Sequence, residues 1–371
     1  MVAPKLRFKE FDGDWELDLL GNLVQIKSGY SPSKYELDKS GEMPFLKVEE
    51  LNNCDKYQEY SRFYTERNSD AVPSKSVVFP KRGAAILNNK VRILRVDALL
   101  DSNLMALIPQ HSLDAEYLYY LINKIELYKI ADTSTIPQIN NKHIEPYSIY
   151  LPSKEEQTKI ASFLSAVDKK ISQLTRKHQL LSQYKQGMMQ KLFSQQIRFK
   201  ADDGSEFEEW EILKFKDVIT IKYGKDHKKL KDGNIPVLGT GGIMRYVESY
   251  LYDGESILIG RKGTIDKPQF ISGKFWTVDT LFYTEIGEKI RPKFAFQQLL
   301  LVNWLNLNEA TGVPSLNTTS IGNIELKVPC LEEQTKIANF LSAIDQKIEV
   351  VAQQIEQAKQ WKKGLLQQMF V

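Results

Sequence analysis

One stretch of this sequence occurs twice, and it divides the chain into two halves. Residues 155–171 read EEQTKIASFLSAVDKKI and residues 332–348 read EEQTKIANFLSAIDQKI, at a constant shift of 177 positions. The two copies differ at three of seventeen positions, which is too close for chance and indicates a duplication. The rest of the chain is therefore interpreted as two related halves.

Each copy begins a long helix with the apolar repeat of a coiled coil. Apolar residues recur at alternating spacings of four and three, which are the a and d positions of a heptad, and no proline interrupts either run. An apolar stripe of this length needs a partner, and the other copy is the obvious one. The predicted seam residues are Leu164, Val167, Ile171 and Leu174 in the first half and Leu341, Ile344, Ile348 and Val351 in the second.

One seam position is polar in the first half and apolar in the second. His178 occupies the heptad position that Ile355 fills in the second half. A polar residue at such a position usually sets the register of a coiled coil, and a metal ligand would need a second ligand nearby in sequence. His178 is interpreted as structural, and no metal site is predicted.

Composition excludes several classes of protein. The chain has 371 residues, 42% of them hydrophobic, and a formal charge of +3, so it can bury real cores and is not uniformly basic. Cys54 and Cys330 fit neither a disulfide framework nor a zinc site. The first residues resemble no secretory signal and no apolar run is long enough to span a membrane, so a cytoplasmic location is expected.

Two globular regions, about 15–152 and 210–329, precede the two helices. Each contains short β-like runs separated by turn residues and one helical stretch, 115–125 or 292–301, which predicts an α+β fold. The framework repeats, but residues 57–68 have no counterpart and the second region is shorter. The predicted boundaries are 1–152 for the first globular domain, 153–196 for the first helix, 197–329 for a linker and the second domain, and 330–371 for the second helix.

Known catalytic motifs are missing from the sequence. There is no phosphate-binding G-x-x-x-x-G-K-[ST] loop, no G-x-S-x-G elbow and no H-E-x-x-H pair. The glycine-rich stretch 239–242 is interpreted as a tight turn, because nothing like a dinucleotide fingerprint follows it. An acidic string such as Glu36 with Asp38 is too common in a chain with 47 acidic residues to indicate a nuclease. A stand-alone enzyme is not expected.

Basic and aromatic residues follow two strands in each globular region. Lys and Arg on loops that contain glycine can reach phosphates or guanine edges, although basic turns are also common on solvated surfaces. The recurrence of both loops in both halves favours DNA contact. The candidate DNA-binding residues are Lys27, Tyr30, Lys34, Lys81 and Arg82 in the first half and Lys222, Tyr223, Lys225, His227, Lys228, Lys229, Thr240, Arg245, Arg261 and Lys262 in the second.

The order of these features resembles the specificity subunit of type I restriction-modification enzymes. The features that carry the resemblance are the duplicated Glu-Glu-Gln-x-x-Ile-Ala-x-Phe-Leu, the ending Lys191-Leu192-Phe193-Ser194 of the first helix, and the repeated lead-in Arg-Phe-Lys…Trp. The resemblance covers nearly the whole chain. It implies two target-recognition domains separated by a long antiparallel two-helix coiled coil, with an internal pseudo-two-fold repeat.

The resemblance also implies the function and the partners. Each domain would read one half of a bipartite, asymmetric double-stranded DNA target, and the helices would set the spacer. Two methyltransferase subunits would dock on the scaffold, and translocating restriction subunits would join in the full complex. S-adenosylmethionine, ATP and magnesium would be used by these partners, so no cofactor and no catalytic residue is predicted in this chain.

Two equivalent partners require two equivalent patches, and the duplicated helix starts are the candidate docking surfaces. Their repetition lies largely off the coiled-coil seam, although acidic residues in a first helical turn are also favoured by the helix dipole. The predicted docking residues are Glu155, Glu156, Gln157 and Lys159 in the first copy and Glu332, Glu333, Gln334 and Lys336 in the second.

Two other functions are compatible with parts of the sequence. A two-headed coiled-coil adaptor that binds proteins would share the repeat and the long helices. A fused restriction enzyme would need an active site of its own, which the missing motifs argue against. Salt-dependent binding to DNA separates the first alternative from a specificity subunit.

Overall fold

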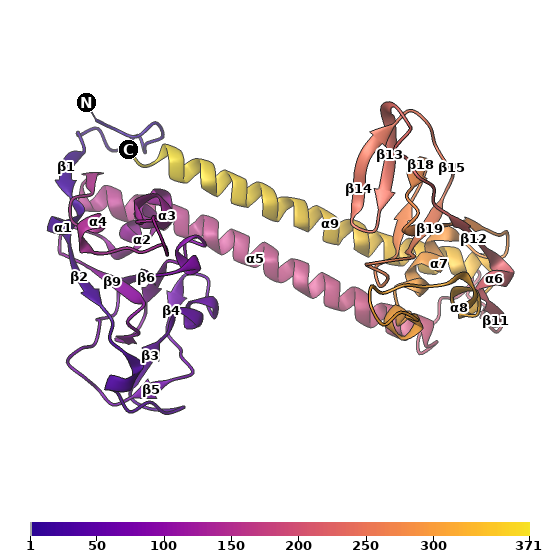
Figure 1. The fold of residues 1–371 in the computed structure, drawn as a ribbon, viewed down its shortest axis with the longest axis horizontal. Coiled ribbons are helices and arrows are strands. Elements are labelled where there is room, and N and C mark those ends of the chain that lie inside the picture. The colour runs from indigo at the N-terminus through magenta and orange to yellow at the C-terminus, as the bar shows by residue number, and fades with distance from the viewer. Residues whose placement is uncertain (1) are drawn as a thin grey trace. The chain divides into compact units, whose positions relative to one another are not determined.

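The computed structural model describes residues 2–371, and the chain divides into two units (Figure 1). Unit 1 comprises Met1–Leu174 and Gln354–Val371, and unit 2 comprises Thr175–Gln353. Each unit contains one globular region, one end of the first long helix and the opposite end of the second.

Unit 1 is built on a five-stranded sheet in the order β2-β9-β6-β7-β4, covered by helix α2 (Ala115–Ile125). The helix is amphipathic and its N-cap Asp114 accepts a hydrogen bond from the Tyr117 amide, so its start is fixed locally. Its apolar face buries Tyr117 and Tyr120 in the main core of the unit. The strands are β2 (Val24–Ser28), β9 (Leu104–Pro109), β6 (Val77–Pro80), β7 (Arg92–Leu94) and β4 (Tyr57–Gln58).

Smaller elements complete unit 1. A second sheet has the order β5-β3-β8, and β1 pairs antiparallel with β10 just before the first long helix. These strands are β1 (Glu16–Leu19), β3 (Met43–Leu46), β5 (Tyr64–Thr65), β8 (Leu99–Leu100) and β10 (Ser148–Leu151). The short helices are α1 (Leu20–Leu23), η1 (Pro32–Lys34), η2 (Val48–Asn52), η3 (Ala84–Ile86), α3 (Leu127–Ile130) and α4 (Asn141–Ile144).

Unit 2 repeats this plan with two four-stranded sheets, in the orders β12-β19-β16-β17 and β14-β13-β18-β15, and with the pair β11-β20. Helix α7 (Pro292–Leu299) packs on the first sheet, as α2 does in unit 1. The other elements are β11 (Glu211–Lys214), α6 (Phe215–Val218), β12 (Ile219–Tyr223), β13 (Asp232–Gly239), β14 (Gly242–Val247), β15 (Tyr252–Asp253), β16 (Ser256–Gly260), β17 (Gln269–Ile271), β18 (Lys274–Thr277), β19 (Leu281–Ile286), η4 (Trp304–Leu307), α8 (Thr318–Gly322) and β20 (Glu325–Val328).

The two units differ most in one connection. In unit 2 the antiparallel strands β13 and β14 are joined by a turn of two residues, Thr240 and Gly241. In unit 1 the equivalent strands β3 and β5 are separated by residues 47–63, which contain η2 and β4. We call residues 47–63 the inserted segment. It accounts for most of the extra length of the first globular region, and its strand β4 joins the main sheet.

The long helices α5 (Lys154–Phe193) and α9 (Leu331–Gln368) run antiparallel. In unit 1 the start of α5 shares an apolar cluster with the end of α9, where Leu164 and Val167 lie with Leu365. In unit 2 the end of α5 shares a cluster with the start of α9, where Leu192 lies with Leu341. The eight predicted seam residues are buried or half-buried, as the seam of a heptad repeat requires.

Ion pairs flank this seam at equivalent places. Asp168 of α5 accepts from Lys362 of α9 at 2.6 Å in unit 1, and Asp345 of α9 accepts from Lys185 of α5 at 2.7 Å in unit 2. The shift of 177 residues relates both members of the two pairs. The duplication is therefore a repeat of contacts as well as of sequence.

Other predictions about local structure are confirmed. The helices expected at 115–125 and 292–301 are α2 and α7, and the glycine-rich stretch 239–242 is the turn between β13 and β14. Among residues 2–371, no helix is both long enough and apolar enough to cross a bilayer.

Two glycines inside the long helices provide a stability prediction. Gly187 of α5 and Gly364 of α9 are equivalent, and a Cβ added at either would meet nothing within 4 Å. We expect Gly187→Ala and Gly364→Ala each to raise the free energy of unfolding by about 1 kcal/mol, because alanine restricts the unfolded chain and favours the helix. Chemical denaturation measures this change. A loss of stability in both variants would contradict the open surroundings of these positions.

Candidate nucleic-acid interface

The two predicted basic loops of each unit leave the same edge of its main sheet. In unit 1, strands β2 and β6 both run antiparallel to the β9 strand that lies between them, so their carboxyl ends meet at one edge. In unit 2, β12 and β16 flank β19 in the same way. The loops 29–34 and 81–83 therefore lie together in unit 1, and the loops 224–229 and 261–263 lie together in unit 2.

The loop after β6 or β16 has the same backbone contacts in both units. The amide of Gly83 donates to the Pro137 carbonyl at 2.8 Å, and the amide of Gly263 donates to the Pro314 carbonyl at 2.9 Å. Both glycines have positive φ, 79° and 89°, a conformation that other residues adopt only with strain. The side chains just before them, Arg82 and Lys262, are exposed on a fixed backbone.

The loop after β2 or β12 begins at a glycine pressed against a neighbouring chain segment. A Cβ added to Gly29 would lie 2.2 Å from the Asp101 carbonyl oxygen, and one added to Gly224 would lie 2.0 Å from the Val278 carbonyl oxygen. Only glycine allows this approach. The same glycine therefore directs the first basic loop along the same path in both units.

Several candidate residues of unit 1 have partners within the unit. Lys27 donates to the Ala71 carbonyl at 2.9 Å, and Lys34 forms an ion pair with Asp70 and lies 3.8 Å above the Tyr30 ring. Burial, with a smaller contribution from the adjacent Arg82, lowers the pKa of Lys81. The Arg82 side chain is exposed.

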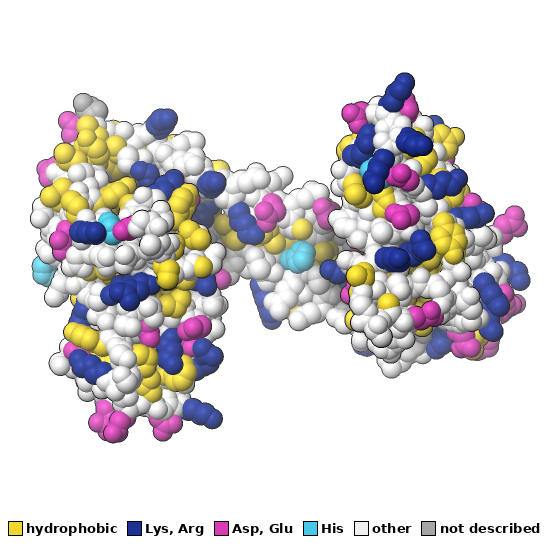
Figure 2. All heavy atoms as spheres, viewed as in Figure 1, with side chains coloured by type: hydrophobic (Ala, Val, Ile, Leu, Met, Phe, Trp, Pro, Cys, Tyr) yellow, Lys and Arg dark blue, Asp and Glu magenta, His cyan; other side chains and the backbone are white. Residues whose placement is uncertain are grey.

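Unit 2 presents more of its candidates to solvent. Lys225, Lys228, Lys229 and Lys262 are exposed, and the Arg261 guanidinium lies 5.5 Å from the centre of the exposed Tyr223 ring. Lys222 pairs with Glu285 at 3.4 Å and Arg245 with Asp232 at 2.7 Å. Lys and Arg side chains alternate with hydrophobic ones on the face of unit 2 shown in Figure 2.

A pocket of about 730 Å³ lies among three segments of unit 2. His227 and Lys228 line it from the first basic loop, Thr240 from the β13–β14 turn, and Asp279 and Thr280 from the turn just before β19. The Nδ1 atom of His227 is buried and has no hydrogen-bond partner among residues 2–371. Among the same residues, no group of three or more His, Cys, Asp or Glu side chains is placed to hold a metal ion.

The predicted docking residues at the helix starts include four that are buried. Gln157 accepts from the Asp114 amide at 2.8 Å and donates to the carbonyls of Ser112 and Pro152, both at 3.0 Å. In unit 2, Gln334 makes the equivalent contacts with the Arg291 amide, the Lys289 carbonyl and the Pro329 carbonyl, at 2.7, 3.0 and 2.8 Å.

The adjacent glutamates bind the lead-in segments, which begin with the repeated Arg-Phe-Lys at residues 7–9 and 198–200. Glu156 accepts two hydrogen bonds from Arg7, both at 2.8 Å. Glu333 accepts from Arg198 at 3.2 and 2.8 Å and from the Trp210 indole at 3.0 Å. These hydrogen bonds account for the repetition of Glu156 and Gln157 as Glu333 and Gln334.

The docking prediction is therefore wrong for Glu156, Gln157, Glu333 and Gln334, because a partner cannot reach side chains that are buried in their own unit. Docking stays a prediction for Glu155, Lys159 and Glu332, which are exposed, and for Lys336, which is half-buried and pairs with Asp202 at 2.6 Å. The sequence did hold a signal for the correct contacts. The Arg-Phe-Lys…Trp lead-in is repeated together with the helix start, and the two repeated segments bind one another.

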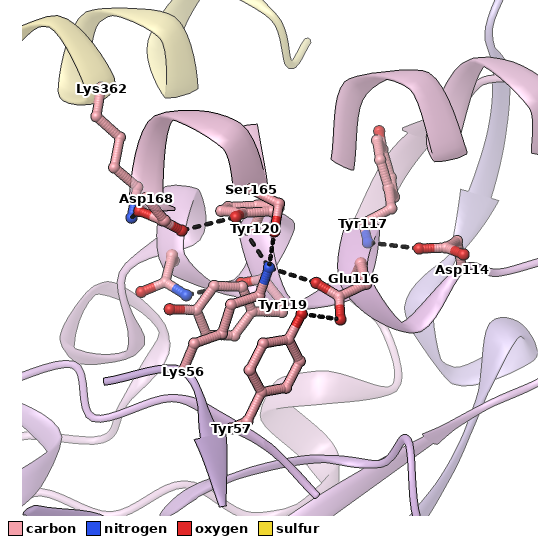
Figure 3. Close-up of polar contacts among 11 residues, drawn as sticks. Lys56, Tyr57, Asp114, Glu116, Tyr117, Tyr119, Tyr120, Ser165, Asp168 and Lys362 are labelled. Carbon is pink, nitrogen blue, oxygen red and sulfur yellow. Dashed lines mark hydrogen bonds and ion pairs between the residues drawn. The ribbon is translucent and has the colours of Figure 1, made fainter. Parts of the chain in front are cut away.

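A buried polar network in unit 1 was not predicted from the sequence (Figure 3). Lys56, from the inserted segment, is buried, forms an ion pair with Glu116 of α2, and donates to Tyr120 of α2 at 3.0 Å and to Ser165 of α5 at 3.1 Å. Tyr120 in turn donates to Asp168 of α5 at 2.7 Å. The network links the inserted segment, α2 and α5.

The surroundings of the network keep its tyrosines protonated. Burial and the hydrogen bond to Glu116 raise the pKa of Tyr57 to about 12, and burial with the bond to Asp168 raises the pKa of Tyr120 further. In unit 2, Gln297 takes the place of Tyr120 and donates to Asp345 at 2.8 Å. The aspartate contact is thus common to both units, whereas the lysine belongs to unit 1.

Comparison with known proteins agrees with this arrangement. Residues 12–182 and 207–360 match the family described as type I restriction modification DNA specificity domain. The specificity subunit of the type I restriction enzyme MjaVIII of Methanocaldococcus jannaschii is 26% identical, over 97% of this chain and 94% of that protein. The specificity subunit of EcoprrI of Escherichia coli is 22% identical, over 88% of this chain and 86% of its own length.

Solved structures share the fold. The S subunit of a type I restriction-modification system from M. genitalium superposes with a TM-score of 0.67 at 17% identity, over 100% of this chain and 99% of that one. A chain from a study of complex assembly and conformational transition of the type I R-M system gives a TM-score of 0.60 at 14% identity, over 96% and 97% of the two chains.

Proposed function

Since this chain belongs to the type I restriction-modification DNA specificity family, we propose that each unit reads one half of a bipartite DNA target. The two regions that match the family are its two target-recognition domains. The observation that carries this proposal is the pair of basic loops at one sheet edge in both units. Their backbones are equivalent, whereas their side chains differ. Two different surfaces on one framework fit an asymmetric target.

The long helices have a separate role in this proposal. Helices α5 and α9 extend from one unit into the other, and 40 residues of α5 span about 60 Å. They would set the spacer between the half-sites. Two methyltransferase subunits would dock near the repeated residues Glu155, Lys159, Glu332 and Lys336. These partners and the restriction subunits would use S-adenosylmethionine, ATP and magnesium, and this chain would carry no catalytic residue.

Domain exchange tests the assignment of half-sites. Replacing residues 15–152 with the equivalent region of another specificity subunit is expected to change one half of the methylated sequence and leave the other half and the spacer intact. Single-molecule methylation mapping of DNA from cells that also carry the methyltransferase gives the result. A change in both half-sites would contradict independent reading by the two units, and replacement of residues 210–329 is the reciprocal control.

The basic loops are expected to contact phosphates. Lys262→Gln should weaken binding to any duplex, because it removes a positive charge, and should reduce the slope of log K against log salt by about 0.9. Binding of the purified full-length chain is measured by fluorescence anisotropy over a salt series. Lys216→Gln is the matched control, since exposed Lys216 lies on α6 at the opposite end of β12. Equal slopes in both variants would rule out the Lys262 contact.

The same salt series separates the proposed function from a protein-binding adaptor. An adaptor would show no salt-dependent binding to a random duplex, with or without the methyltransferase. A specificity subunit should bind a random duplex through phosphates, and its binding should strengthen when the methyltransferase is added.

A further inference from the structure

The β13–β14 hairpin of unit 2 carries large apolar side chains at its exposed end. Ile243 is 56% exposed and Met244 is 59% exposed, and both follow the turn formed by Thr240 and Gly241. Tyr246, further along β14, is also exposed. Exposed apolar residues that are grouped at a turn point to a surface that another molecule covers.

A β-bulge turns Met244 outward. The pairing changes from Leu238 opposite Ile243 to Val237 opposite Arg245, so Met244 is an extra residue in β14. Its sulfur covers Gly239, where an added Cβ would lie 2.7 Å away. Val247, further along β14, is buried in a small cluster with Val237 and Val278, so the hairpin is anchored in unit 2 while Met244 stays 59% exposed.

The apolar tip lies beside the second basic loop. A Cβ added to Gly263 would lie 4.0 Å from the hydroxyl oxygen of Thr240 in the hairpin turn. Met244 and Ile243 also line the pocket that contains His227 and Lys228 of the first basic loop. The apolar tip is thus bordered by exposed cations from both loops.

This combination matches the chemistry of a DNA groove. Phosphates lie along the rims of the groove and attract cations, while base edges and the thymine methyl group lie between them and accept apolar contacts. A two-stranded ribbon fits the major groove, which is about 12 Å wide. In unit 1 the inserted segment separates the equivalent strands, so this tight hairpin is a feature of unit 2.

We propose that the β13–β14 hairpin enters the major groove of the half-site read by unit 2 and places Ile243 and Met244 against base edges, where they contribute to sequence discrimination. The proposal rests on the proposed function, because it requires unit 2 to bind DNA. It adds that discrimination there depends on apolar contacts as well as on the basic loops.

The test compares target and random duplexes. The full-length chain with Ile243→Ser and Met244→Ser is titrated over a salt series with the duplex defined by methylation mapping and with a random duplex. We expect about a tenfold loss of affinity for the target, with unchanged affinity for the random duplex and an unchanged salt slope. Ile212→Ser is the matched control, because Ile212 is 66% exposed on β11, and it should change neither affinity.

A second measurement identifies the contact. Replacing each thymine of that half-site with uracil removes a methyl group, and at least one position should weaken binding of the natural chain but not of the doubly substituted one. Met244→Gln keeps an unbranched side chain and serves as the variant if the double substitution lowers the melting temperature. Unchanged target affinity in a folded variant, or an equal loss for target and random duplexes, would overturn the hairpin proposal. Failure of the natural chain to prefer its target would instead overturn the proposed function.

Discussion

Replacing Glu333 with alanine is expected to lower the free energy of unfolding by about 3–5 kcal/mol. The carboxylate is buried and accepts two hydrogen bonds from Arg198 and one from the Trp210 indole. Its removal leaves the Arg198 guanidinium with only the carbonyls of Phe207 and Glu208 as acceptors, and leaves the buried Trp210 N–H without one. Denaturant titration followed by tryptophan fluorescence measures the loss, because three of the five tryptophans, Trp210, Trp276 and Trp304, lie in unit 2.

The adjacent residue supplies the control for this prediction. Glu332→Ala removes an exposed carboxylate one position earlier in the same helix turn, and its effect should stay within about 0.5 kcal/mol. Glu156→Ala in unit 1 should cost less than Glu333→Ala, because the Trp15 indole nitrogen makes no hydrogen bond to Glu156 and is buried without a partner among the described residues. Equal losses for Glu332→Ala and Glu333→Ala would contradict the structural role assigned to the buried carboxylate.

The second large effect is expected from Lys56→Met, which should lower the stability of unit 1 by about 3 kcal/mol. The substitution keeps the length of the side chain but removes the ammonium that Glu116, Tyr120 and Ser165 share. The double variant Lys56→Met with Glu116→Gln should recover part of the loss, since the glutamine leaves no uncompensated charge. Thermal unfolding followed by circular dichroism compares the variants.

Lys39→Met is the control for the loss of a lysine, because Lys39 lies in the same unit and is exposed. Its melting temperature should match that of the natural chain. If adding Glu116→Gln to Lys56→Met lowered stability as much as Glu116→Gln does in the natural chain, the two residues would contribute independently. The network would then not act as a unit.

Features set by local sequence or by the repeat were predictable. The heptad pattern identified α5, α9 and their seam because an apolar stripe must be buried wherever the helix lies. Glycines before the basic loops predicted turns, and both loops lie at equivalent places because the surrounding strands are duplicated. The helix α2 and its counterpart α7 were expected at 115–125 and 292–301, where the sequence has helical stretches.

The missed features depend on contacts between distant segments. The repeat at the helix starts fits a docking surface and an internal contact equally well, and only the folded position of Arg7 and Arg198 distinguishes them. Lys56 reads as an ordinary surface lysine because its partners are 60 or more residues away in sequence. The apolar hairpin tip was hidden for another reason, since exposure of Ile243 and Met244 depends on a bulge that shifts the strand register.

Gln157 and Gln334 hold their globular regions through main-chain amides and carbonyls alone. These contacts depend on the backbone path of the globular region and not on the identity of its side chains. Under the proposed function, recombination would graft a foreign domain onto the same helices without compensating changes at this joint, and substitutions in the basic loops would not loosen it. A new DNA specificity would then need one exchange on an unchanged scaffold.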